Sequence, residues 1–199
     1  LIFSTSLAGA EEKTTPFELQ SKSALLMEYS TGEIVVEKDS RKQLSPASIT
    51  KMMVMLLTME AVDSGKIKLT DKVIATPEAC RMGGSQIWLE PGEEMTVEEL
   101  MKAVGIVSAN DASYALAEFL AGSHEEFVRL MNKRAQELGM SETSYVNSTG
   151  LSADSGSGNL TCANDQTILA RELLKHPSIL KWTGVWIDSL RGGESFLRN

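Results

Sequence analysis

Two short stretches near the start of the chain have the hydrophobic pattern of β-strands. Residues 23–29 and 33–38 are each rich in apolar residues, and the segment Ser30-Thr31-Gly32 lies between them. Small polar residues followed by glycine favour a tight turn between two strands. The pattern therefore predicts a β-hairpin over residues 23–38.

The pattern becomes helical from residue 48 onward. Residues 48–63 are apolar on almost every side of a helix, and Ser64 and Gly65 follow as a stop signal. A helix that is apolar all round is buried, so we expect this helix inside the domain, with its four methionines filling the core. Further helices are predicted over residues 97–105, 111–120, 125–138 and 167–174.

Capping residues support two of these helices. Thr96 precedes Glu99 by three positions, and Ser123 precedes Glu126 by three, which is the spacing of a capping box. Two strands followed mainly by helices predict a mixed α/β (α+β) sandwich. On this pattern the remaining strands of its sheet are expected beyond Asn199.

Length and composition are those of a globular domain. The chain has 199 residues, of which 42% are hydrophobic and 23% are charged, enough for one sizeable domain or most of a larger one. There are 19 Lys and Arg against 27 Asp and Glu, so the formal net charge is −8. A negative balance argues against nucleic acid as a partner, because phosphate backbones require a basic face. No stretch of the sequence is long and apolar enough to span a bilayer.

The N-terminal residues and the cysteines each leave two interpretations open. Residues 1–10 are apolar and end in small residues at Ala8 and Ala10, as at a signal-peptidase site, so we expect a signal-peptide remnant. The alternative is the frayed N-terminus of a cytosolic domain. Cys80 and Cys162 have no Cys-x-x-Cys neighbour and no histidine at ligand spacing, so we predict two partly buried thiols, and no metal or cofactor. Whether the two thiols pair cannot be read from their separation.

The strongest candidate for chemistry is the pair Ser48 and Lys51. On a helix, positions i and i+3 lie on one face, so the lysine amine can reach the serine hydroxyl. Burial in the apolar helix would lower the pKa of the lysine and favour the neutral form that accepts a proton. The helix N-terminus would stabilise negative charge on the serine. Taken alone, Ser-x-x-Lys also fits the solvated start of an ordinary helix.

A second motif, Ser108-Ala109-Asn110, follows a predicted helix. Taken alone, Ser108 and Asn110 are ordinary capping residues, and Asp111 favours the dipole of the helix that it opens. His124 and His176 are expected on the surface at helix ends, so no histidine-based triad is predicted.

Ser-x-x-Lys followed by Ser-x-Asn belongs to the motif set of penicillin-interacting serine enzymes. With these motifs, the chain resembles the D-alanyl-D-alanine carboxypeptidases among the low-molecular-mass penicillin-binding proteins. Residues 83–93, 138–143 and 147–151 resemble connecting segments of that family, and the resemblance runs from residue 23 to the end. It implies a β-lactamase/transpeptidase-like sandwich of a helical lobe and an antiparallel sheet over residues 11–199.

The resemblance also implies roles for the motif residues. Ser48 would attack the carbonyl between the two terminal D-alanines of a peptidoglycan stem peptide, and Lys51 would accept its proton. Ser108 would relay that proton to the departing D-alanine. Asn110 would bind the substrate backbone or orient Lys51. A water would then hydrolyse the acyl-enzyme.

The family further implies partners and a location. Its members are acylated by β-lactam antibiotics and act outside the cytoplasmic membrane, so we expect a secreted enzyme at the extracytoplasmic face of the bacterial cytoplasmic membrane. Membrane association would come from a C-terminal part outside this chain.

One departure from the family pattern concerns the third motif. No Lys-Thr-Gly occurs in the sequence, so we expect the chain to end before the strand that carries it. In the family that strand binds the substrate carboxylate and supplies one donor of the oxyanion hole. Loss of such a donor costs about 10²–10³ in turnover, so the 199 residues alone are expected to be inactive and poorly folded.

Two other functions remain open. A serine β-lactamase shares the fold and motifs, but that class carries an aspartate where this chain has Ala109. A non-catalytic penicillin-fold protein that binds wall peptides is the other alternative, and the intact Ser48 and Lys51 argue against it.

Overall fold

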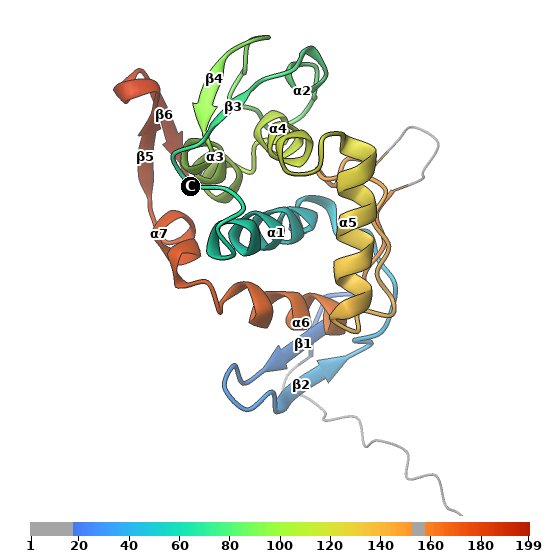
Figure 1. Ribbon diagram of the computed structural model, residues 1–199. Coiled ribbons are helices and arrows are strands. Elements are labelled where there is room, and N and C mark those ends of the chain that lie inside the picture. Colours follow the sequence, from blue (N-terminus) through green and yellow to red (C-terminus); the bar gives the residue numbers. More distant parts are fainter. Residues whose placement is uncertain (1–17, 153–157) are drawn as a thin grey trace, which may run out of the picture.

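We analysed a computed structural model that describes residues 18–152 and 158–199 of the chain. The proposed signal-peptide remnant, residues 1–10, lies outside the described residues. Within them the structure combines helices with short antiparallel strands, and one helix, α1 (Lys51–Asp63), lies at the centre (Figure 1).

The hairpin predicted near the start of the chain is confirmed. Strands β1 (Ala24–Met27) and β2 (Ile34–Lys38) pair antiparallel, with Ala24 opposite Lys38 and a register shift after Leu26. Gly32 has a φ of +77° in the turn, a conformation that glycine adopts without steric cost.

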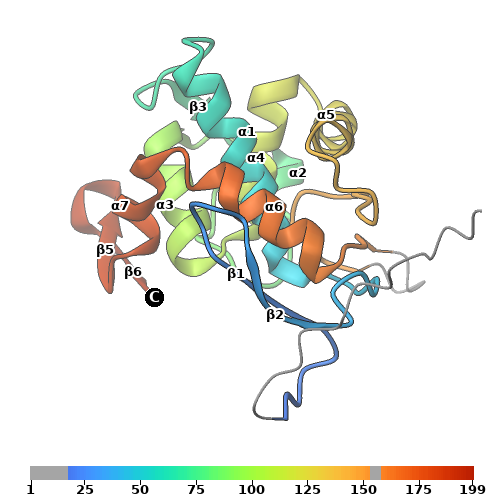
Figure 2. The same cartoon turned by 90° about the horizontal axis from the view of Figure 1, so that it is seen from below.

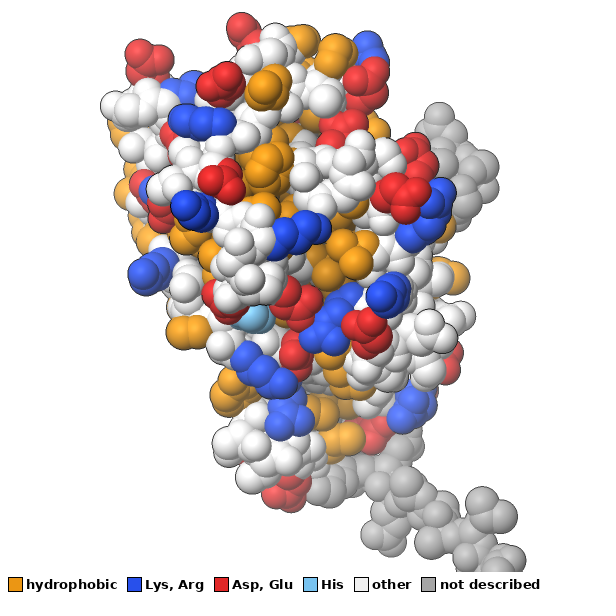
Figure 3. Space-filling view, in the orientation of Figure 1, with side chains coloured by type: hydrophobic (Ala, Val, Ile, Leu, Met, Phe, Trp, Pro, Cys, Tyr) orange, Lys and Arg blue, Asp and Glu red, His pale blue; other side chains and the backbone are white. Residues whose placement is uncertain are grey.

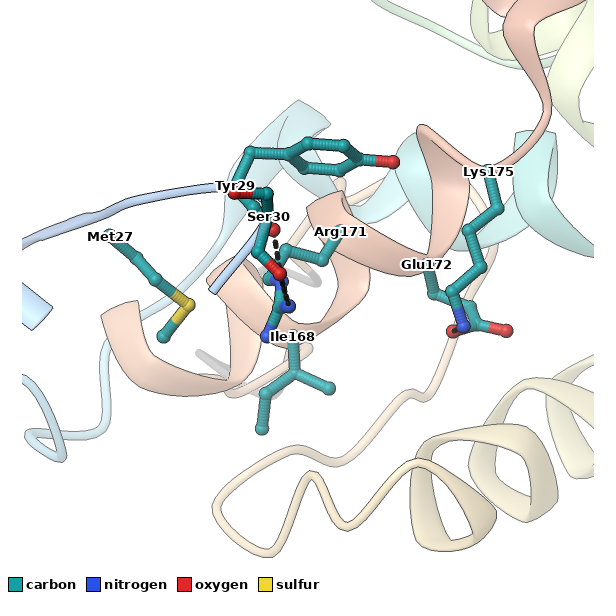
Figure 4. Close-up of a pocket in the computed structure, with 7 residues that line it drawn as sticks. All are labelled: Met27, Tyr29, Ser30, Ile168, Arg171, Glu172 and Lys175. Carbon is teal, nitrogen blue, oxygen red and sulfur yellow. Dashed lines mark hydrogen bonds and ion pairs between the residues drawn. The ribbon is translucent and has the colours of Figure 1, made fainter. Parts of the chain in front are cut away.

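Helix α6 (Ala163–Leu173) holds this hairpin against the helical part of the molecule. β1 packs against α6 (Figure 2). Figure 4 shows the Arg171 side chain reaching from α6 to the turn, where it donates hydrogen bonds to the carbonyls of Tyr29 (3.0 Å) and Ser30 (3.5 Å). A long cationic side chain thus joins two segments that are more than a hundred residues apart in the sequence.

The central helix is buried as predicted, but its first turn differs. Residues 47–50 form a 3-10 helix, η1 (Ala47–Thr50), that runs directly into α1. Helix α1 contacts α3 (Val97–Val107), α4 (Asn110–Ala121), α5 (His124–Glu137) and α6, so it is covered on several sides (Figure 1). Nine of its residues are buried: Lys51, Met53, Val54, Met55, Leu56, Leu57, Thr58, Met59 and Ala61.

Two further hairpins were not predicted, and each forms a two-stranded sheet separate from that of β1 and β2, so the expectation of further strands beyond Asn199 stays a prediction. Strands β3 (Lys72–Ile74) and β4 (Glu94–Thr96) pair antiparallel, as do β5 (Ile187–Leu190) and β6 (Ser195–Arg198). Strands of three or four residues are too short for an alternating pattern to stand out in the sequence. The predicted mixture of helices and antiparallel strands is confirmed.

The short helical elements are α2 (Pro77–Cys80), η2 (Pro177–Ile179), α7 (Leu180–Thr183) and η3 (Arg191–Gly193).

The two predicted capping boxes have different outcomes. At α3 both halves form, because the Thr96 hydroxyl accepts from the Glu99 N–H and the Glu99 carboxylate accepts from the Thr96 N–H. At α5 the Ser123 hydroxyl accepts from the Glu126 N–H at 3.1 Å, but the Glu126 carboxylate pairs with Arg129 instead. The second box is therefore only half formed.

Ion pairs link α1 to two neighbouring helices. Arg134 on α5 forms ion pairs with Glu60 on α1 (2.6 Å) and Glu172 on α6 (3.1 Å), so it joins three helices.

Cys80 and Cys162 are free thiols. None of the described helices has the length and apolar character needed to cross a membrane. On the face in Figure 3, acidic and basic side chains are interspersed with hydrophobic ones.

The burial of α1 predicts how two neighbouring methionines respond to truncation. Met53 is fully buried, whereas Met52 is only partly buried at the edge of the core. Met53→Ala removes core contacts and leaves a cavity, so it should lower the free energy of unfolding by about 2–5 kcal/mol. Met52→Ala serves as the matched control and should cost clearly less. Denaturant unfolding of both variants of the complete natural protein measures this, and equal losses would contradict the packing described.

Candidate active site

Ser48 lies in η1 with its side chain open to solvent. The residue before it, Ala47, has a φ of +45°, which is unusual for a residue other than glycine. Such a conformation costs of the order of 1 kcal/mol or more and persists where the surroundings enforce it. The turn therefore presents the Ser48 hydroxyl at the surface, directly before the buried helix α1 begins.

Lys51, the first residue of α1, is buried with a relative exposure of 3%. Its Nζ lies 3.3 Å from Ser48 Oγ and donates a hydrogen bond to the Thr149 carbonyl at 2.7 Å. Burial lowers the pKa of Lys51 from 10.5 to about 8, because a buried ammonium loses its hydration. At pH 7 about one molecule in ten then carries the neutral amine.

This pair has the geometry of a nucleophile with its base. A neutral Nζ has a lone pair that can accept the Ser48 proton, and 3.3 Å is the range in which such contacts occur before substrate tightens them. Ser48 is accessible while Lys51 is shielded, so the hydroxyl faces the solvent and the amine beside it stays desolvated. The structure thus brings together the first two residues predicted from the sequence.

The acceptor that holds Lys51, the Thr149 carbonyl, was not predicted. It belongs to residues 147–151, which we call the Thr149 loop. The Asn147 side chain accepts from the N–H groups of Thr149 (3.1 Å) and Gly150 (2.7 Å), which folds the loop tightly. The Asn159 amide donates to Asn147 O (3.0 Å) and to the buried Thr50 hydroxyl (2.8 Å), which ties the loop to the end of η1. In the sequence only its likeness to a family connecting segment drew attention to this loop.

Gly150 brings the Thr149 loop against the backbone beside Ser48. Its φ is +85°, and a Cβ added there would lie 1.9 Å from Ala47 O and 3.0 Å from Ser48 N. No other residue fits at this separation without moving the backbone. Close approach of two backbones thus sets how Ser48 and the Thr149 loop lie relative to each other.

Ser108 directly follows α3 and Asn110 is the first residue of α4, and both helices contact α1. Ser108 is the C-cap of α3, with a φ of +57°, and its hydroxyl makes no hydrogen bond to another described residue. No hydrogen bond among the described residues joins Ser108 or Asn110 to Ser48 or Lys51. The roles predicted for Ser108 and Asn110 therefore stay predictions.

Asn110 is buried, and its side chain contacts the segment at Gly83 and Gly84, which also lies near the Thr149 loop. Its Nδ2 donates to Gly83 O at 2.7 Å, while its Oδ1 has no partner among the described residues. A Cβ added at Gly84 would meet both Asn110 Nδ2 (2.7 Å) and Leu151 Cδ2 (3.6 Å). Residues from three remote segments thus meet around the Asn110 side chain. Its Oδ1 is free to accept a hydrogen bond from a ligand or a water.

Asp111 has more contacts than a helix-start residue needs. It is 1% exposed, and its carboxylate accepts from the N–H groups of Ile87 (3.1 Å) and Leu89 (3.1 Å). The interpretation as an ordinary first-turn residue was therefore incomplete. Asp111 fixes the segment after Gly84, and an acidic residue at a helix start gives no signal of such a remote contact.

The two histidines also correct the sequence analysis. His124 is half-buried and stacks on Tyr114, with ring centroids 4.3 Å apart, and burial lowers its pKa. His176 Nδ1 lies 2.6 Å from Asp63 Oδ2 at the far end of α1. Both rings were expected at the surface, because the residues that contact them are remote in the sequence and gave no signal.

In the described part of the chain, His, Cys, Asp and Glu side chains form no group of three that could hold a metal ion.

The fold and site define a class of protein. The helical lobe with short antiparallel strands matches the penicillin-binding protein fold. The crystal structure of PBP3 from Streptococcus pneumoniae aligns with a TM-score of 0.87 and 32% identity, over 92% of this chain and 55% of that one. A second structure, penicillin-binding protein D2 from Listeria monocytogenes in its ampicillin-bound form, aligns with a TM-score of 0.81 and 27% identity, over 94% of this chain and 74% of that one.

Sequence comparison then gives the family. The D-alanyl-D-alanine carboxypeptidase family model matches residues 10–195, and the chain belongs to this family. It is 53% identical over 180 residues to the D-alanyl-D-alanine carboxypeptidase DacF of Bacillus subtilis (strain 168), covering 90% of this chain and 46% of that protein. The chain thus spans less than half the length of that relative.

The close approach at Gly150 predicts a strong effect of one methyl group. Gly150→Ala combines a left-handed φ with a clash against Ala47 O, so we expect a loss of about 2–5 kcal/mol in the free energy of unfolding. Gly139→Ala is the matched control, because Gly139 has a φ of +77° but open space around it. The control should lose only about 1–2 kcal/mol from backbone strain. Similar losses in both variants would mean that the Thr149 loop does not press against η1.

Proposed function

We propose that this chain carries the nucleophile and base of a serine D-alanyl-D-alanine carboxypeptidase. The observation that carries the proposal is the exposed Ser48 hydroxyl, 3.3 Å from a buried Lys51 amine whose pKa burial lowers to about 8. Membership of the D-alanyl-D-alanine carboxypeptidase family supports the reaction, and the name of the Bacillus subtilis relative supports the substrate class.

The first half of the reaction forms an ester on Ser48. The neutral Lys51 amine takes the hydroxyl proton as Ser48 Oγ attacks the carbonyl between the two terminal D-alanines. The positive end of the α1 helix dipole lies beside the reacting oxygen and stabilises its developing charge. Collapse of the tetrahedral adduct breaks the C–N bond, and the proton passes through Ser108 to the amine of the departing D-alanine.

The second half regenerates the serine. Lys51, neutral again after the proton has left, accepts a proton from a water that attacks the ester carbonyl. The ester C–O bond breaks, Ser48 regains its proton from Lys51, and the shortened peptide leaves as a carboxylate after releasing the second proton of the water to solvent. In both halves the hydrogen bond from Nζ to Thr149 O occupies one N–H of the amine, which leaves the lone pair available to the Ser48 side.

Asn110 is proposed to contact the substrate. Its buried Oδ1 lacks a partner among the described residues, so it can accept an N–H from the stem-peptide backbone. An orienting role toward Lys51 has less support, because the Asn110 amide nitrogen donates to Gly83 O and Lys51 donates to Thr149 O.

The same proposal covers β-lactams and location. The ampicillin-bound form of the Listeria monocytogenes structure supports acylation by β-lactams here. Peptidoglycan stem peptides lie outside the cytoplasmic membrane, which supports an extracytoplasmic enzyme. Membrane association through a C-terminal part remains a proposal from the family. No comparison favours the serine β-lactamase or the non-catalytic alternative.

Intact-mass spectrometry tests this proposal. The complete natural protein, mixed with penicillin, should gain the mass of one penicillin molecule and keep it for many minutes, because the ester on Ser48 is formed faster than it is hydrolysed. Ser48→Ala should gain no mass. Ser45→Ala, three residues earlier and also exposed, is the control and should react like the unmodified protein.

Two results would contradict the proposal. A transient adduct with rapid destruction of penicillin would indicate a β-lactamase. No adduct on a cooperatively folded protein would leave only the non-catalytic binding protein. Release of free D-alanine from a pentapeptide, lost in Ser48→Ala, is the matching assay for the natural reaction.

A further inference from the structure

The Thr149 loop is fixed by a histidine that the proposed chemistry does not use. His124 Nε2 lies 3.2 Å from the Ser148 N–H and 3.1 Å from Ser148 Oγ. A backbone N–H can only donate, so Nε2 must be the acceptor. The imidazole is therefore neutral, with its proton on Nδ1. A protonated ring would have no lone pair for this bond.

The His124 ring is itself held in place. It stacks on Tyr114 of α4 with ring centroids 4.3 Å apart and planes 9° from parallel. His124 is also the first residue of α5, where the positive end of the helix dipole disfavours a charged ring. Burial lowers the pKa of His124 and outweighs the neighbouring charge of Glu125, which raises it, so burial and helix position both favour the neutral, accepting form.

Ser148 is held at both of its backbone groups. Its N–H donates to His124 on α5, and its carbonyl accepts from the Ser113 hydroxyl on α4 at 2.9 Å. Ser148 is fully buried, with no exposed surface. Two helices therefore fix the orientation of this residue.

The next carbonyl along the chain is the one that binds Lys51. Because peptide units are planar, rotation at Ser148 would turn the peptide between Ser148 and Thr149, and the next peptide, which holds the Thr149 oxygen, would be displaced with it. That oxygen makes a 2.7 Å hydrogen bond with Lys51 Nζ. Displacements of about 1 Å in a catalytic group can cost about 100-fold in rate. The bond from Ser148 to His124 is thus connected to the base through one peptide unit.

We propose that His124 is a positioning residue for Lys51. Its neutral imidazole fixes the Ser148 backbone, so that the Thr149 carbonyl orients the Lys51 amine toward Ser48. This inference rests on the proposed function, because it gives His124 an effect only where Lys51 acts as the base of Ser48.

Two substitutions separate the hydrogen bond from the stacking. His124→Phe keeps a ring that can stack on Tyr114 but removes the acceptor. His124→Gln removes the ring but carries an amide oxygen that can accept the Ser148 N–H. His176→Gln, at the far end of α1, is the control for the loss of a histidine elsewhere. Each variant is made in the complete natural protein, and its free energy of unfolding is measured.

The readout is the second-order rate constant for acylation of Ser48 by penicillin, measured against pH. For His124→Phe we expect a fall of about 10- to 100-fold. We also expect the acid limb of its pH profile to shift to lower pH, because a lost carbonyl acceptor no longer stabilises the Lys51 ammonium. His124→Gln and His176→Gln should stay within about twofold of the unmodified protein, with an unshifted limb.

The outcomes distinguish this inference from the proposed function. If the unmodified protein is not acylated at Ser48, the proposed function fails and this inference fails with it. If it is acylated but His124→Phe reacts equally fast, or the Phe and Gln variants lose rate equally, only the positioning role is overturned. Should His124→Phe not fold, ¹⁵N shifts of His124 in the unmodified protein give the test. A neutral ring protonated on Nδ1 supports the role, and a proton on Nε2 contradicts it.

Discussion

The burial of one lysine amine is the constraint on which the site depends. Lys51 is 3% exposed, and its Nζ lies between the Ser48 hydroxyl and the Thr149 carbonyl. Taking an ammonium out of water is costly, so burial shifts the equilibrium toward the neutral amine. In the proposed mechanism, that shift lets an ordinarily charged side chain serve as a base near neutral pH. The helices packed around α1 provide the burial, so the fold supplies the chemistry.

The second requirement is that the neutral amine points at Ser48. The groups that ensure this come from remote parts of the chain: the Thr149 carbonyl is 98 residues from Lys51, and Gly150 packs against Ala47. The loop that carries them is held by Asn147 and Asn159, and by His124 on α5. The exposed Ser48 hydroxyl, the shielded Lys51 amine and the Thr149 carbonyl thus keep their positions through contacts between segments that come together only in the native structure.

The sequence was sufficient for the parts of this arrangement that are local. The spacing of Ser48 and Lys51 placed the two side chains on one helical face, and the apolar run after them predicted the burial of α1. The hairpins formed by β3 to β6 were not predicted from the sequence, because their strands have only three or four residues. The contacts of Thr149 and His124 were not predicted for another reason: Lys51 binds a backbone carbonyl, and the His124 ring accepts from the backbone N–H of Ser148, and backbone groups leave no signature in the sequence.

The central claim, that Lys51 is a base poised near neutral pH, has a direct test. The ¹³Cε resonance of Lys51, assigned by comparison with Lys51→Arg, is followed by NMR against pH in the complete natural protein without ligand. The account predicts a titration midpoint of about 8, displaced from the ordinary lysine value of 10.5. A midpoint near 10.5 would mean that the amine stays charged at neutral pH, and it would contradict the role of Lys51 as the base of Ser48.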